Sequence, residues 1–333
     1  MWISETLDAL LSGHDLTDEQ MQRMIESFVS GQSDEAEMAA LLIALRAKGE
    51  TSRELAVAAS VLRKQMIRLE PEVEVLDTCG PGGDGLGTFN ISTATALVVA
   101  GCGVPVLKHG NRAISSRSGS ADVLSTLGVE AQSDPEWPMR CLKQTNLGFC
   151  FAPFFHPALK HVAAVRRKLA VRTLFNCLGP LVHPAEAAHQ LLGVGRPEWL
   201  NLLAGALAHL GVKRAILVSG SDGLDEVTLT GPTAYREVTE GKIDSGQWTP
   251  DDFDLAPCNL DELRVNGPEE SANLILRILE GEEGAPARMV LANSAACLFV
   301  VGHASTLKEG VAMSREAIQS GQAMKVLTLL RTT

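Results

Sequence analysis

Apolar residues recur at helical spacing through the first 70 residues of the chain. Helical runs follow Thr17, Ser33 and Thr51, and Gly31 ends the first of them. Glu54 stands three residues after Thr51, which is the spacing of a capping box. The pattern therefore predicts a small N-terminal α-helical domain over residues 1–70.

At Pro71 the pattern changes to short apolar runs separated by helical stretches. Strands are indicated at residues 73–77, 104–107, 148–151, 190–194 and 213–219, and helices at residues 91–101, 118–127, 269–279, 287–301 and 307–320. Residues 227–243 alternate in the manner of an antiparallel hairpin. Alternating strands and helices predict a larger α/β domain over residues 71–333, with a mostly parallel sheet covered by helices.

Composition and charge narrow the classes of partner. The chain has 333 residues, of which 45% are apolar, so it can bury a conventional core. A net charge of −11 argues against nucleic-acid and anionic-membrane partners, which need a basic face, and 4% aromatic residues leave little for base stacking. Seven scattered cysteines without a C-x-x-C pair indicate a reducing compartment, and residues 1–8 do not read as a signal peptide. We expect a cytoplasmic protein.

The first candidate for chemistry is the glycine-rich segment GPGGDG at residues 80–85, which follows an expected strand. Glycines let backbone N–H groups approach an anion closely, although a tight structural turn explains them as well. The spacing matches neither the nucleoside-triphosphate loop nor the dinucleotide fingerprint.

Two polar segments follow the glycine-rich one. Residues 90–93 (NIST) open a helix, where free N–H groups attract phosphate; ordinary N-capping is the alternative, but it needs only one of these polar side chains. Residues 108–116 (KHGNRAISS) follow the next expected strand and bring positive charge to the same edge of the sheet. Together these segments predict an anion-binding site.

Two further groups are candidates for binding. Asp225 and Glu226 are adjacent carboxylates after an expected strand, which suits Mg²⁺ together with substrate phosphates, although acidic pairs are commonly only solvated. Arg166 and Arg167 lie in a basic helical stretch, and an arginine there suits a carboxylate through paired hydrogen bonds. The residues alone do not choose between the two arginines.

Six segments in this order resemble the anthranilate phosphoribosyltransferase family: residues 80–85, 90–94, 108–112, 118–122, 172–181 and 222–226. The resemblance implies an α/β domain of the nucleoside phosphorylase and phosphoribosyltransferase type and a homodimer formed through the helical domain. It also implies transfer of phosphoribose from 5-phosphoribosyl 1-pyrophosphate (PRPP) to the amino group of anthranilate. The cofactor implied is Mg²⁺, with two ions per subunit.

The family's binding residues carry over to matching positions. PRPP would contact Gly80, Gly83, Asp84, Thr88, Asn90, Ile91, Ser92, Thr93, Lys108, His109, Gly110, Asn111, Arg112, Ala113, Ile114, Ser115, Ser116 and Ser120. Anthranilate would contact Gly80, Asn111 and Arg166, and Mg²⁺ would be held by Ser92, Asp225 and Glu226. No general base is implied, because a neutral aromatic amine can attack directly and catalysis is then electrostatic and positional.

The chain departs from the family pattern at two positions. Pro81 stands where a threonine is usual, and His183 stands where an asparagine is common. Two other functions fit parts of the pattern. A pyrimidine nucleoside phosphorylase is disfavoured by Lys-His-Gly-Asn at residues 108–111, and a nucleic-acid-binding protein of the same fold is disfavoured by the acidic composition.

Overall fold

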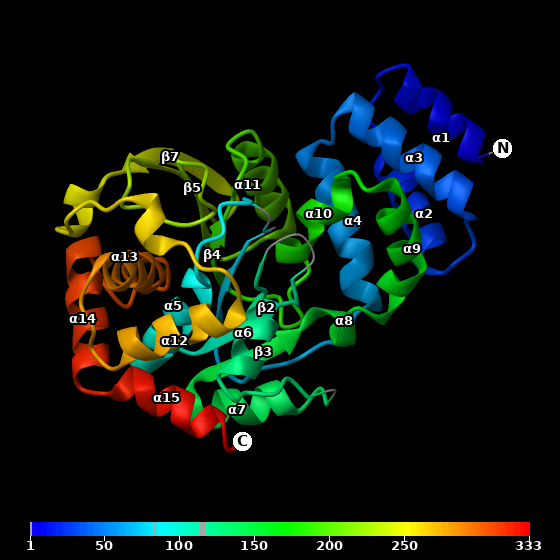
Figure 1. Cartoon of the computed structure of the whole chain (residues 1–333). Helices are drawn as coiled ribbons and strands as arrows, with labels where there is room; N and C mark the ends of the chain where they lie inside the picture. The colour runs from blue at the N-terminus through cyan, green and yellow to red at the C-terminus, as the bar shows by residue number, and fades with distance from the viewer. Residues whose placement is uncertain (1, 81, 83, 114–116, 133) are drawn as a thin grey trace.

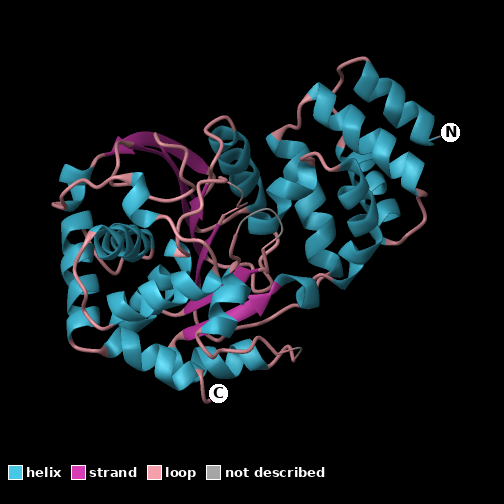
Figure 2. Ribbon diagram, in the orientation of Figure 1, coloured by secondary structure: helices cyan, strands magenta, loops and turns pink. Residues whose placement is uncertain are grey.

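The chain forms a small helical domain that projects from a larger α/β domain (Figure 1). This computed structural model describes residues 2–80, 82, 84–113, 117–132 and 134–333. Figure 2 shows helices on both sides of one sheet in the larger domain and only helices in the smaller one. Two expectations, a small N-terminal helical domain and a larger α/β domain with a mostly parallel sheet, are confirmed.

The helical domain begins with four helices: α1 (Trp2–Leu11), α2 (Asp18–Val29), α3 (Glu35–Lys48) and α4 (Ser52–Gln65). Thr17, Asp34 and Thr51 close capping boxes at the starts of α2, α3 and α4. The cap of α3 is therefore Asp34 and not Ser33. Helix α1 was not among the expected elements.

Later helices complete the helical domain. After a turn of helix at α8 (Ala152–Phe155), α9 (Lys160–Leu169) and α10 (Leu174–Leu178) pack against α2, α3 and α4. Val162 and Phe175 belong to the same buried cluster as Met24 and Leu41. The core of the helical domain thus draws residues from both before and well beyond position 70 (Figure 1).

One seven-stranded sheet runs through the α/β domain in the order β3-β2-β1-β4-β5-β6-β7. Its strands are β1 (Leu76–Cys79), β2 (Val106–Gly110), β3 (Leu147–Phe151), β4 (His189–Gly193), β5 (Arg214–Gly220), β6 (Thr233–Thr239) and β7 (Lys242–Trp248). The first five are parallel, and β6 and β7 form an antiparallel hairpin at one edge. The expected hairpin exists, but it begins at Thr233; residues 227–232 form no strand, and the hydroxyl of Thr228 donates instead to Asp222.

The expected first strand is also displaced. Pairing begins at Leu76, which lies opposite Val106 and His189, whereas Val73 is 52% exposed. Glu74 turns outward and pairs with Lys213. Val75 is buried and its backbone oxygen accepts the N–H of His189 at 3.3 Å, but regular strand pairing does not extend back to Val73.

Helices cover both faces of the sheet. Leu191 and Ile216 face a core shared with α5 (Ile91–Gly101), α13 (Ala285–Val300), α14 (Leu307–Gln319) and α15 (Gln322–Leu330). Leu192 and Leu217 face α11 (Trp199–Leu210), which packs on α4 of the helical domain. The remaining helices are α6 (Ser120–Thr126), α7 (Trp137–Thr145) and α12 (Pro268–Leu279). No helix of the described chain is long and apolar enough to cross a membrane.

Candidate active site

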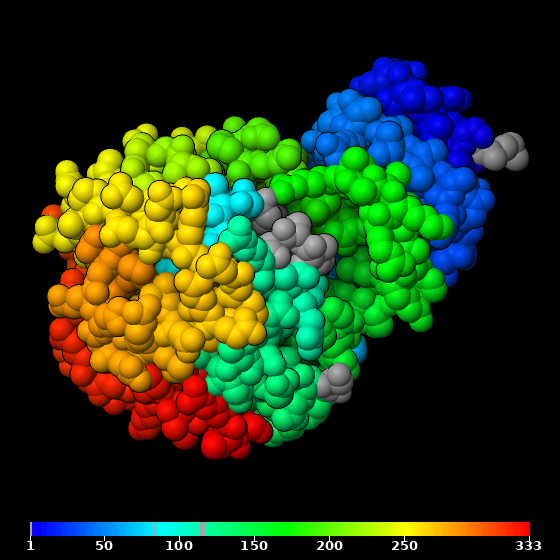
Figure 3. Space-filling model, in the orientation of Figure 1, coloured from blue at the N-terminus to red at the C-terminus, as the bar shows by residue number. Residues whose placement is uncertain are grey.

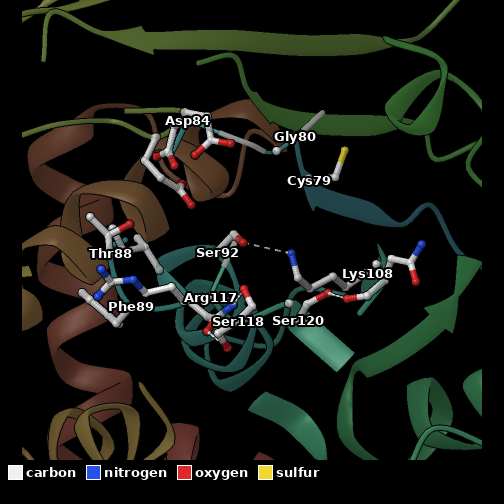
Figure 4. Close-up of a pocket in the computed structure, with 18 of the residues that line it drawn as sticks. Cys79, Gly80, Asp84, Thr88, Phe89, Ser92, Lys108, Arg117, Ser118 and Ser120 are labelled. Carbon is white, nitrogen blue, oxygen red and sulfur yellow. Dashed lines mark hydrogen bonds between the residues drawn. The ribbon is translucent and has the colours of Figure 1, made fainter. Parts of the chain in front are cut away.

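A pocket of about 340 Å³ lies at the carboxyl ends of the central strands. It forms where β1 separates β2 from β4, which is the switch point at which ligands bind in open α/β sheets. In the space-filling view, the cyan and turquoise segments that form its walls lie between the green helices and the yellow and orange segments (Figure 3). Figure 4 shows the side chains that converge on it.

Most of the expected site residues meet in this pocket. It is lined by Gly80, Asp84, Thr88, Asn90, Ile91, Ser92, Lys108, His109, Gly110, Asn111, Ser120, Asp225 and Glu226. Of the other expected residues, Thr93, Arg112, Ala113 and Arg166 are described but do not line it. Gly83, Ile114, Ser115 and Ser116, as well as the departure at Pro81, lie outside the described residues.

Two loops bring three carboxylates to one wall of the pocket. Asp84 comes from the glycine-rich loop, and Asp225 and Glu226 follow β5. Burial raises the pKa of Asp225 to about 7, and the charge of Asp84 adds to the rise. Burial, and then the charge of Asp225, raise the pKa of Glu226 well above its usual value. The wall concentrates negative charge that a cation would stabilise.

Lys108 supplies positive charge beside these carboxylates. Its Nζ donates to the backbone oxygen of Thr78 and to the hydroxyls of Thr78 and Ser92, the last at 3.2 Å (Figure 4). The side chain is almost completely buried, so its charge is weakly screened. Lys108 therefore connects β2 with β1 and with the start of α5. Its positive charge lowers the electrostatic free energy of placing three carboxylates in one wall.

The start of α5 faces the pocket without a side-chain cap. Asn90 occupies the N-cap position, yet its side chain makes no capping hydrogen bond. The backbone N–H of Ser92 donates to the carboxylate of Glu226, which lowers the pKa of that group against the effect of burial. The N-capping alternative thus does not describe Asn90, and the helix N-terminus points its partial positive charge at the pocket.

A close crossing of backbones was missed by the sequence analysis. A Cβ atom on Gly193 would lie 1.6 Å from the backbone oxygen of Asp225, and one on Gly80 would lie 2.6 Å from the oxygen of Gly193. A Cβ atom on Gly195 would lie 3.2 Å from the Cβ of Asp84, so Gly195 also allows a close approach. These glycines let the ends of β1, β4 and the loop after β5 converge.

A second missed element is the segment at residues 263–266, between the hairpin and α12. The N–H of Phe89 donates to Leu263 at 2.9 Å, and the N–H of Val265 donates to Gly87 at 2.9 Å. Arg117, which lines the pocket, donates to the side chain of Asn266 at 3.2 Å. This segment therefore holds the outer wall of the pocket from a distant part of the chain.

Three buried histidines form a cluster at the pocket, which His109 lines. The Nε2 atoms of His109 and His156 are 3.3 Å apart, and the ring of His183 meets that of His109 edge-on. Burial lowers the pKa of all three, to about 4 for His156, so the cluster is neutral. His183 bonds the oxygen of Leu107 at 2.6 Å and accepts the N–H of Ala185.

The His183 departure is explained by this pair of bonds. A neutral imidazole offers one donor and one acceptor, as an asparagine amide also does. Because Leu107 immediately precedes Lys108, His183 supports the strand that carries the buried lysine. A second buried polar contact supports the same strand, since Asp77 accepts the backbone N–H of His109 at 3.0 Å.

The two candidate arginines differ in their surroundings. Arg166 is half-buried with its guanidinium 5.8 Å from the ring centre of Phe175, whereas Arg167 is exposed. Burial lowers the pKa of Arg166, but the group remains a cation. Helix α9, which carries both, packs against α2 and α3 of the helical domain.

The acidic wall fits Mg²⁺ as a site that the substrate completes. Among the described residues, no group of three or more His, Cys, Asp or Glu side chains is arranged to hold a metal by itself. Mg²⁺ commonly uses one or two carboxylates and takes its other ligands from phosphates and water. Asp225 and Glu226, with the hydroxyl of Ser92 nearby, are oxygen donors of that kind.

Comparison with known proteins places the chain first in a class of two-domain transferases. Residues 4–66 match the helical bundle domain of the glycosyl transferase family, and residues 72–324 match its α/β domain. The chain belongs to this family.

Relatives that match the chain over almost its full length identify the enzyme family within this class. The chain is 47% identical to anthranilate phosphoribosyltransferase from Rhodopirellula baltica, covering 98% of this chain and 96% of the relative. The Thermus thermophilus enzyme of that name superposes with a TM-score of 0.92 at 41% identity and 98% coverage of each chain. A Saccharomyces cerevisiae structure with PRPP and Mg superposes at 0.91, with 28% identity and 99% and 97% coverage, and another yeast structure contains 4-fluoroanthranilate. The chain is a member of the anthranilate phosphoribosyltransferase family of enzymes.

Proposed function

We propose that this protein transfers the 5-phosphoribosyl group of PRPP to the amino group of anthranilate in tryptophan biosynthesis, releasing pyrophosphate. The observation that carries the proposal is the pocket itself, in which a helix N-terminus and a buried lysine face an acidic wall. An anion and a divalent cation complement these two walls. Relatives with this name, and yeast structures with PRPP, Mg and an anthranilate analogue, support the choice of substrates.

The residues give a simple division of roles. A bond forms between the amine nitrogen and C1 of the ribose while the bond from C1 to pyrophosphate breaks, and the amine proton is released. Mg²⁺, when bound, neutralises charge on the departing pyrophosphate. Ser92, Asp225 and Glu226 would hold that ion, while Asn90 and the backbone at the start of α5 would bind the phosphates, with Lys108 contributing its positive charge. Catalysis is positional and electrostatic, and no side chain acts as a nucleophile.

A fluorescence assay of anthranilate consumption tests the proposal. Turnover is expected only with PRPP and Mg²⁺ present together. A nucleoside phosphorylase of related fold would instead release a base from a pyrimidine nucleoside in the presence of phosphate. That second reaction, without the first, would replace the proposed function.

We assign Arg166 to the anthranilate carboxylate. Arg166→Ala should raise the KM for anthranilate about 10- to 100-fold, since a hydrogen bond to a charged group contributes about 1.5–3 kcal/mol. The KM for PRPP should change little. Arg167→Ala is the matched control, because it removes an exposed guanidinium from the same helix. Equal effects of the two variants on both substrates would contradict the assignment.

The acidic wall predicts how Mg²⁺ stabilises the fold as pH changes. The pKa of Asp225 is raised to about 7 in the folded protein, so the folded state binds more protons than the unfolded state in the acid range. Without Mg²⁺, stability should therefore fall as pH rises toward and through neutrality. The gain in Tm on adding Mg²⁺ should be larger at about pH 8 than at about pH 6. A series of thermal melts with and without Mg²⁺ measures it, and a gain that shrinks as pH rises would oppose the metal assignment.

Two further properties belong to the same proposal. We infer a homodimer formed through the helical domain, where Leu11 of α1 is 70% exposed and Ile43 of α3 is 40% exposed. Sedimentation at several concentrations would give twice the chain mass if this is right. We also infer a cytoplasmic location, supported by seven free cysteines, and cell fractionation tests it.

A further inference from the structure

The side chain of Asn90 is held by two serines from different parts of the chain. Its Oδ1 lies 2.8 Å from the hydroxyl of Ser118 and 2.8 Å from the hydroxyl of Ser271. Its Nδ2 lies 3.3 Å from the backbone oxygen of Ser118. The backbone N–H of Asn90 also donates to Ser271 Oγ at 3.0 Å, so Ser271 both accepts from and donates to the same residue.

These contacts determine which way the amide faces. The backbone oxygen of Ser118 can only accept, so the amide nitrogen must be on that side. Oδ1 then accepts from two hydroxyls, which leaves the amide nitrogen as the group with hydrogen-bonding capacity to offer a ligand. Asn90 lines the pocket and thus presents a donor, which suits a phosphate oxygen.

Ser271 is placed to maintain this orientation from outside the pocket. It lies in the first half of α12, is fully buried, and is 181 residues from Asn90 in sequence. Helix α12 packs against α6, which begins at Ser120 of the polar loop. Ser271 therefore ties Asn90 to a helix that itself borders the donor loops.

We propose that Ser271 is a positioning residue for the phosphoribosyl donor: together with Ser118, its hydroxyl holds the Asn90 amide so that the pocket receives the N–H and not the carbonyl oxygen. The proposal rests on the proposed function for the identity of the donor. Loss of the hydroxyl leaves Oδ1 with Ser118 alone and the Asn90 N–H without its acceptor. The amide is then held by Ser118 alone, so its Nδ2 is less firmly oriented toward a phosphate.

Ser271→Ala tests this by separating the two substrates. The KM for PRPP should rise about 3- to 10-fold, which is the change in affinity that the loss of one neutral hydrogen bond usually causes. The KM for anthranilate should stay unchanged. Ser271→Thr, which keeps the hydroxyl, should restore the KM for PRPP. Ser314→Ala is the matched control, because Ser314 is also a fully buried helical serine, but its hydroxyl donates within its own helix, to the backbone oxygen of Gly310 at 2.7 Å.

A calorimetric titration with PRPP in the presence of Mg²⁺, and without anthranilate, measures the affinity for PRPP independently of turnover. If the protein binds PRPP but does not use anthranilate, the proposed function fails and the affinity difference still tests Ser271. A purely structural serine would lower Tm and leave PRPP affinity as it is in Ser314→Ala, and that result would overturn the proposal. Should Ser271→Ala not fold, Ser271→Cys keeps the size of the side chain but offers only a weak hydrogen-bond donor and acceptor. A loss of PRPP affinity in this variant supports the proposal, and unchanged affinity refutes it.

Discussion

Replacing Asp225 and Glu226 together by alanine should abolish Mg²⁺-dependent use of PRPP. The expected fall in kcat/KM is on the order of 10³-fold, because metal stabilisation of developing charge is worth several kcal/mol and about 1.4 kcal/mol corresponds to tenfold. Both carboxylates line the pocket beside Ser92 and Lys108. Steady-state kinetics with Mg²⁺ varied at fixed PRPP measure the loss.

A shape-preserving variant separates lost metal binding from lost structure. Asp225→Asn with Glu226→Gln removes the charges and keeps the size of both side chains. The raised pKa of each carboxyl means that the folded protein disfavours the charged forms. Without Mg²⁺ at about pH 8, this variant should melt at a higher temperature than the unmodified protein while remaining inactive.

The opposite pattern would be equally informative. A double amide variant that melts lower and keeps Mg²⁺-dependent turnover would show that the carboxylates stabilise the loop and do not hold the metal. Asp222 is an example of a carboxylate that stabilises this loop, because it accepts hydrogen bonds from the hydroxyls of Thr228 and Thr230.

Local signals in the sequence predicted much of the fold. The capping box at Thr51 and the alternation of strands and helices are short-range features, and the structure contains both. Helix α1 was missed, and so was α15, which begins after Gly321 without a side-chain cap. Strand ends were displaced where pairing with neighbours, as at Leu76, decides the boundary.

The sequence predicted those parts of the site in which a single loop contains a recognisable group of binding residues. The acidic pair, the glycine-rich segment and the polar loop could each be recognised in the sequence from their charged side chains or hydrogen-bond donors. Ser271 and Asn266 carry no such signal, because their importance arises from contact with residues more than a hundred positions earlier. A serine inside an amphipathic helix reads as an ordinary core position until the fold brings Asn90 against it.

The importance of Gly193 also arises from a contact that the sequence does not reveal, its close approach to Asp225. Gly193→Ala should be among the most damaging single substitutions. Its Cβ would lie 1.6 Å from the backbone oxygen of Asp225, a separation that no side-chain rotation can relieve. The loop after β5 must therefore move away from the end of β4. A displacement of about 1 Å at a catalytic group can reduce the rate about 10²-fold. Overpacking should also lower the free energy of unfolding by about 1–3 kcal/mol or more.

The control for this substitution is Gly267→Ala. Gly267 has an extended backbone, and a Cβ atom there would meet only the carboxylate of Glu269 at 3.5 Å, an ordinary contact. Chemical denaturation and Mg²⁺ titration of both variants compare the effects. Gly193→Ala should lose Mg²⁺ response together with stability, since Asp225 moves with its backbone, whereas Gly267→Ala should keep both. If Gly193→Ala retained normal Mg²⁺ affinity, the convergence of β1, β4 and the acidic loop would not determine the geometry of the metal site.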